Sequence, residues 1–93
     1  MQLRISDTVI WEETRDGISL YHTETGAFLT LNETGAKIWT LIDKLGERAA
    51  VVWQMALQYA GTNATMSRHI RGEVDAFITS VVGSGLVTEG VPA

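Results

Sequence analysis

The sequence has 93 residues, of which 45% are hydrophobic and 19% charged, with a single proline. This composition predicts one globular domain spanning residues 1–93, with its core at about residues 7–88, and it argues against a disordered chain. The lack of cysteine excludes disulfides and thiolate metal sites, and a net charge of -4 argues against binding to nucleic-acid phosphates.

The first third of the chain shows the side-chain alternation of β-strands. Three short runs of alternating apolar and polar residues are separated by turn signals, at residues 8–12, 18–22 and 27–31. In the first run Val9 and Trp11 share one side, and Asp16-Gly17 supplies a turn before the second run. These patterns predict a three-stranded antiparallel meander, which needs a covering layer to be stable.

Helical spacing begins after residue 31. Asn32 is a favourable N-cap for a first helix, which we expect to end at Gly46. A second helix is expected at residues 49–59, and a third begins near residue 65 or 67 and ends at Gly83. The third helix carries an apolar stripe formed by Ile70, Val74, Phe77, Ile78 and Val81.

The order of strands and helices predicts the fold class. Three strands followed by three helices indicate an α+β domain, winged-helix-like in outline, in which the helices cover one face of the meander. Leu86 and Val87 should fold back onto the core, and the tail beyond them should fray.

Residues that could carry catalysis or hold a metal are scattered. His22 and His69 lie in different predicted elements without a partner at ligand spacing, and the glycines match no phosphate-binding loop. Gly83-Ser84-Gly85 follows a helix, whereas a nucleophile elbow follows a strand. We therefore expect a non-catalytic protein without a metal or cofactor.

Three segments in a fixed order carry a family resemblance. The first is Val9-x-Trp11, and the second runs Gly26-x-x-x-x-Leu31-Asn32-Glu33-x-Gly35-Ala36-x-Ile38-Trp39. The third is Val74-x-x-Phe77-Ile78-x-x-Val81-x-x-x-Gly85-Leu86-Val87. Over about residues 7–88, this series resembles the PqqD-like family of RiPP recognition elements, domains that bind the leaders of ribosomally made, post-translationally modified peptides.

The resemblance implies that a leader peptide adds as an extra strand at the edge of the third strand, beside the third helix. Residues 26–31 suit this role, because they have no charge or proline to protect an edge, although an ordinary central strand would show the same pattern. The implied leader-binding residues are Ala27, Phe28, Leu29, Thr30, Leu31, Arg71, Val74, Asp75, Ile78 and Val82. For Arg71 and Asp75, an ion pair between positions i and i+4 is the alternative role.

Among such domains, the compact length and Trp11 are most similar to the stand-alone leader-binding protein of lasso-peptide biosynthesis. That resemblance implies three partners: the precursor leader, a transglutaminase-like leader peptidase and the cyclase. The alternatives are a peptide chaperone of the pyrroloquinoline quinone type and a winged-helix DNA-binding domain that would use Arg68, His69 and Arg71. No membrane partner is expected, and the N-terminus lacks a secretion-signal pattern, so we expect a cytoplasmic protein.

The predicted second helix has almost no polar face. Residues 49–59 carry no charge, and a small domain has too little mass to enclose an apolar helix on all sides. We expect part of this surface to be exposed and to dock the leader peptidase, with Trp53 and Tyr59 as contacts. The alternatives are that Trp53 and Leu57 fill the core, or that the surface mediates self-association.

Overall fold

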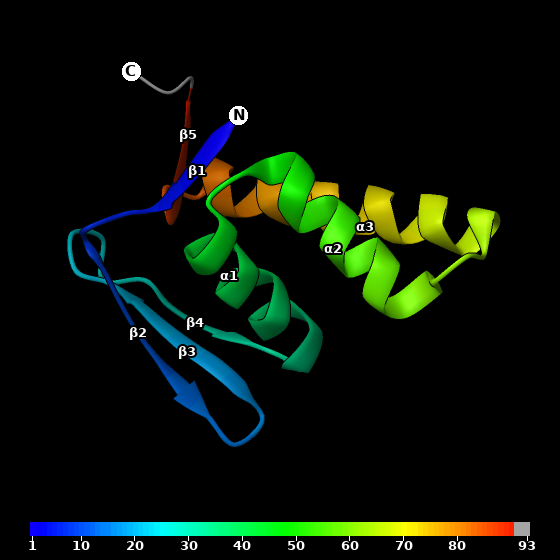
Figure 1. Ribbon diagram of the computed structural model, residues 1–93. Coiled ribbons are helices and arrows are strands. Elements are labelled where there is room, and N and C mark those ends of the chain that lie inside the picture. Colours follow the sequence, from blue (N-terminus) through cyan, green and yellow to red (C-terminus); the bar gives the residue numbers. More distant parts are fainter. Residues whose placement is uncertain (91–93) are drawn as a thin grey trace.

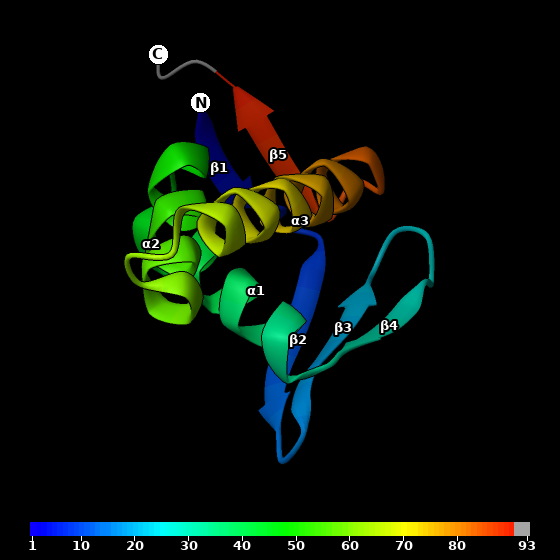
Figure 2. The same ribbon diagram turned by 90° about the vertical axis from the view of Figure 1, so that its right-hand side faces the viewer.

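Figure 1 shows the computed structural model of the protein, which describes residues 1–90. The predicted α+β architecture is confirmed, and α1 lies between the three-stranded sheet and the α2–α3 pair (Figure 2). The elements in chain order are β1 (Gln2–Ile5), β2 (Val9–Thr14), β3 (Gly17–His22), β4 (Phe28–Leu31), α1 (Glu33–Leu45), α2 (Arg48–Ala60), α3 (Ala64–Gly83) and β5 (Val87–Gly90).

The three predicted strands form an antiparallel sheet in the order β2–β3–β4. As the alternation predicts, the face toward α1 is apolar, with buried side chains at Val9, Ile18, Leu20 and Leu31. Trp11 packs edge-on against Trp39 of α1, with the ring centroids 6.2 Å apart. Gly17 allows β3 to begin against the β4–α1 corner, because a Cβ there would collide with the carbonyl oxygen of Leu31.

The first helix begins and ends where its capping residues predict. The Asn32 side chain accepts a hydrogen bond of 2.9 Å from the Gly35 backbone N–H. Gly46 follows the helix in the left-handed conformation, with φ of 64°. The helix covers the inner face of the sheet with three buried side chains, Ile38, Trp39 and Ile42.

A second, two-stranded sheet joins the two ends of the described chain. β1 pairs with β5 in antiparallel register along the whole length of both strands. Leu86 and Val87 are buried as predicted, but the prediction that the chain frays after Val87 is wrong for residues 88–90. The core also reaches N-terminal to residue 7, because β1 supplies the partner strand and buries Leu3. The rest of the predicted tail, residues 91–93, lies outside the described residues.

The remaining two helices pack along each other, as both views show. α2 extends one residue beyond each predicted end, and α3 begins one residue before the earlier predicted start. Glu47 caps α2 and Asn63 caps α3, each through a side-chain oxygen that accepts a 2.8 Å hydrogen bond from a backbone N–H. Within residues 1–90, no helix has the length and apolar character needed to cross a membrane.

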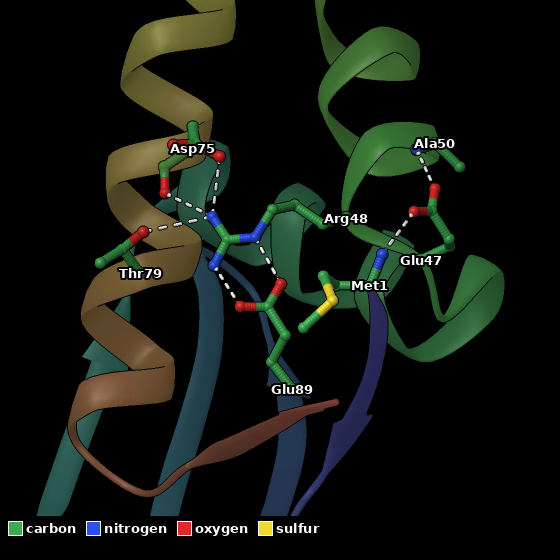
Figure 3. A network of polar contacts seen from close by, with 7 residues as sticks. All are labelled: Met1, Glu47, Arg48, Ala50, Asp75, Thr79 and Glu89. Carbon is green, nitrogen blue, oxygen red and sulfur yellow. Dashed lines mark hydrogen bonds and ion pairs between the residues drawn. The ribbon is translucent and has the colours of Figure 1, made fainter. Parts of the chain in front are cut away.

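Arg48 joins three elements through its guanidinium group (Figure 3). From the first turn of α2, it donates hydrogen bonds to both carboxylate oxygens of Glu89 on β5 and, at 2.7 Å, to the carboxylate of Asp75 on α3. It also donates to the Thr79 hydroxyl at 3.2 Å. The Arg48 hydrogen bonds hold the pKa of Glu89 below its ordinary value. Two-pronged arginine–carboxylate pairing is directional, so the network fixes how α2, α3 and β5 sit together.

Candidate functional site

β4 forms one open edge of the three-stranded sheet, and β2 forms the other. The two edges differ in charge: β2 carries Glu12 and Glu13, both exposed, whereas β4 has neither a charged residue nor a proline. Charged side chains on an edge strand hinder pairing with another chain. The edge of β4 is therefore the one that is open to an added strand.

The β3–β4 turn determines which backbone groups of β4 face outward. Gly26 has φ of 75°, its N–H donates to the His22 carbonyl oxygen at 2.8 Å, and the His22 N–H donates to the Ala27 carbonyl oxygen at 2.9 Å. These two bonds form a glycine bulge, after which successive residues of β4 alternate between bonding to β3 and facing the open edge. The N–H and C=O groups of Phe28 and Thr30 therefore point away from β3.

The buried side chain of His22 braces this turn from the inside. Its Nδ1 accepts hydrogen bonds of 3.3 Å from the backbone N–H groups of Glu24 and Thr25, and its Nε2 lies 3.2 Å from the Thr8 hydroxyl oxygen. Because Nδ1 is an acceptor, the neutral ring carries its proton on Nε2 and donates it to Thr8. The histidine thus has a structural role, holding the turn from which β4 takes its register.

A cleft of about 660 Å³ lies between the start of α1 and the middle of α3. Its lining is mostly apolar and includes Ile38, Met55, Tyr59, Ile70 and Phe77, with polar groups from Asn32, Glu73 and Ser80. Gly35 connects this cleft to the end of β4, since a Cβ there would lie 3.3 Å from the Phe77 ring and 3.5 Å from the Leu31 Cβ. The missing side chain lets Phe77 of α3 pack close to the last residue of β4.

The five residues predicted on the third strand lie at the open edge. Ala27, Phe28, Leu29 and Thr30 are exposed, whereas Leu31 is buried at the corner with α1. Leu29 pairs with a fully buried residue of β3 and shares its face, which is the side of the sheet on which α1 and α3 lie (Figure 2). Its 43% exposure means that it is only partly covered. β4 thus presents an apolar side chain on the side of the sheet where α3 lies.

The apolar residues predicted on α3 are more deeply placed than expected. Val74 lines the cleft but is only 3% exposed, and Ile78 is completely buried in the core. The prediction that Ile78 faces a bound peptide is wrong for this fold, because the core contacts α3 over a wider arc than one narrow stripe. Val82 is partly buried against the same core.

The polar residues predicted on α3 contact α2. The Arg71 guanidinium lies over the Trp53 ring, 4.4 Å from its centre, and Asp75 bonds to Arg48. Each has a partner on α2, so neither the predicted i,i+4 pair nor the predicted orientation toward β4 is found. Of the residues predicted on α3, Val74 lines the cleft, and the other α3 residues in its lining are His69, Ile70, Glu73, Ala76, Phe77 and Ser80. Phe77 belonged to the predicted core stripe, and its spacing alone does not distinguish a core position from a cleft wall.

The residues predicted to dock a partner on α2 are exposed. Trp53 and Leu57, one helical turn apart, are 57% and 66% exposed, so the alternative that they fill the core is wrong. Tyr59 is 43% exposed, with the Lys37 ammonium 5.1 Å from its ring centre. Cations thus lie over the rings of both aromatic residues, which holds them in place while much of their surface faces solvent.

The sequence model of one protein family, described as coenzyme PQQ synthesis protein D (PqqD), matches residues 17–87, well over half of the chain. The chain belongs to the PqqD family. The family resemblance is thereby confirmed: the matched residues include the second and third sequence segments completely, and the first segment, residues 9–11, lies outside them.

Two solved structures share the fold of this PqqD-family chain. One is described as TbiB1 in complex with the TbiA(beta) leader peptide; it is 20% identical, with a TM-score of 0.79 over 96% of this chain and 99% of that chain. The other is described as lasso peptide synthetase B1 complexed with the leader peptide; it is 19% identical, with a TM-score of 0.76 over 96% of this chain and 100% of that chain. A search of curated proteins found no match.

Proposed function

We propose that this PqqD-family domain binds the leader of a ribosomally made precursor peptide as an added strand on β4, beside α3. It then delivers the leader to a leader peptidase and a cyclase in lasso-peptide biosynthesis. The observation that carries the proposal is the uncharged edge of β4, where the backbone groups of Phe28 and Thr30 face outward. The lining of the apolar cleft begins at Asn32, the residue that follows β4. The two solved structures of the same fold, both described as complexes with a leader peptide, support this choice of ligand.

Backbone and side chains have separate tasks in this binding mode. Hydrogen bonds to an edge strand form with any extended peptide, so they supply affinity without selecting a sequence. Selection comes from side-chain contacts, here Leu29 on the inner side of β4 and Phe77 in the lining of the cleft. In this proposal the domain presents the leader, and its partners carry out the chemistry.

A titration with labelled ligands tests the proposal against the alternatives. The probe is the fluorescein-labelled leader of a lasso-peptide precursor from the organism that makes this protein, and the matched control contains the same residues in scrambled order. We expect saturable leader binding at roughly micromolar concentration or below, and no saturation with the control or with labelled duplex DNA. Saturable DNA binding without leader binding would contradict the proposal, and binding only to a pyrroloquinoline quinone precursor would place the protein in that pathway.

We further propose that the leader peptidase docks on the exposed face of α2, through Trp53, Leu57 and Tyr59. Trp53 and Leu57 do not line the cleft, and α2 lies away from the open edge of β4 (Figure 2). Tyr59 does line the cleft, so the proposed leader and peptidase surfaces adjoin at this residue. An exposed group of large apolar side chains on a small domain favours a partner contact.

Replacing Leu57 with glutamate should lower capture of the purified peptidase, because a charge placed in an apolar contact loses its hydration. We expect a loss of roughly tenfold or more in a pull-down by immobilised protein. Gln58→Glu is the matched control, since it adds the same charge at the adjacent exposed position. Leader binding should be equal in both variants. Undiminished capture of the peptidase by Leu57→Glu would contradict docking on α2 and would mean that this helix has only a structural role.

A further inference from the structure

The outer face of the three-stranded sheet carries a row of exposed apolar side chains. Ile10 of β2 lies opposite Tyr21 of β3, and Tyr21 lies opposite Phe28 of β4. Their exposed fractions are 64%, 43% and 67%. Residues in direct register share one face of a sheet, so the three side chains form one row from edge to edge. The helices lie on the other side of this sheet (Figure 2), and the row faces away from them.

The next outward-facing row is polar. It consists of Glu12, Ser19 and Thr30, which are paired in the same way across β2, β3 and β4. The outer face is therefore patterned, with an apolar row and a polar row side by side. Both rows end at the open edge of β4, the apolar one at Phe28 and the polar one at Thr30.

A strand added to β4 extends both rows, whichever direction it runs. The added residues opposite Phe28 and Thr30 are two positions apart, so their side chains lie on the outer face. The residue between them lies opposite Leu29 and points to the inner side. We propose that the outer face selects the bound peptide: the residue opposite Phe28 is a large apolar or aromatic one, and the residue opposite Thr30 is polar. This inference rests on the proposed strand addition and specifies its ligand.

Phe28 is the residue that determines this specificity. It is the last member of its row: Tyr21 lies opposite it on β3, and its other side, toward the open edge, is uncovered by any strand. A large apolar side chain on the added strand removes the uncovered side from water, and aromatic pairs across strands are favourable. A polar side chain at that position leaves the ring hydrated. The outward residues of the leader therefore contribute to selection together with those in the cleft.

The test is a serine scan of the fluorescein-labelled leader, titrated by anisotropy against three proteins: wild type, Phe28→Thr and the matched control Ile10→Thr, which makes the same kind of change at an exposed position on the opposite edge strand. We expect Phe28→Thr to weaken binding of the unmodified leader by roughly five- to tenfold and Ile10→Thr by less than about twofold. At one apolar leader position, serine should weaken binding to wild type and have no further effect in Phe28→Thr. The position two residues away, opposite Thr30, should tolerate serine.

These variants distinguish a failure of outer-face selection from a failure of strand addition on β4. Phe28 is exposed and threonine is a good strand residue, so Phe28→Thr should fold, and Phe28→Leu should retain most of the affinity as a second variant. If wild type and Phe28→Thr bind the leader equally, or if no single leader position couples to Phe28, selection by the outer face is overturned while strand addition stands. If wild type does not bind the leader at all, both proposals fall.

Discussion

Replacing Thr30 with proline should lower leader affinity roughly 100-fold while the fold is retained. The Thr30 N–H points to the open edge, so proline removes a donor offered to the peptide and leaves the β3–β4 hydrogen bonds in place. The proline ring also blocks the approach of a second backbone at that point. Anisotropy of the labelled leader measures the loss, and circular dichroism measures the fold.

Two further variants separate backbone pairing from side-chain effects. Thr30→Val keeps the N–H and the branched shape, so its leader affinity should stay within about threefold of wild type. Leu29→Pro removes a donor that bonds to β3, and it should lower the urea midpoint of unfolding. A folded Thr30→Pro protein that binds the leader as tightly as Thr30→Val would contradict strand addition at β4.

Replacing Arg48 with methionine should lower the free energy of unfolding by roughly 2–3 kcal/mol. The substitution keeps the length of the side chain but leaves the Glu89 carboxylate, 16% exposed, without its partner. It also releases Asp75 and so loosens the contact of α2 with α3 and β5. Urea unfolding followed by tryptophan fluorescence measures the change. Arg48→Lys keeps the positive charge but cannot form the two-pronged pairing with Glu89, so its stability should lie between those of wild type and Arg48→Met. Equal urea midpoints for all three proteins would contradict the role of the network.

The contribution of this network should depend on pH through Glu89. Hydrogen bonds from Arg48 lower the pKa of Glu89 in the folded protein, so folding favours the charged carboxylate. The resulting stability is fully present above the ordinary pKa of 4.5 and is lost as the pH falls through the lower, folded-state value. The difference in unfolding free energy between wild type and Arg48→Met should therefore become smaller as the pH is lowered from about 7 to about 3. A difference that stays constant over this range would exclude Glu89 as its source.

The elements that depend on local interactions could be predicted from the sequence. Asn32 caps α1 through a bond to a residue three positions away, and the glycine at 46 ends that helix by its own backbone conformation. Alternation within β3 identified its buried face. The lack of charge at residues 26–31 was compatible with an edge strand or a central one, and the sheet order places β4 at an edge. These features act within a few residues, so each is visible in a short window of sequence.

Which surfaces face one another depends on long-range packing, and the sequence did not predict it. Arg48 finds its partners 27 and 41 residues away, and β1 pairs with β5 across almost the whole chain. The backbone groups of a strand pair equally well with any other strand, so the local sequence does not name the partner. The orientation of α3 about its own axis is likewise determined by long-range packing. Its apolar stripe is broad enough to permit several rotations, and only packing against α1, α2 and β5 turns Phe77 toward the cleft and Asp75 toward α2.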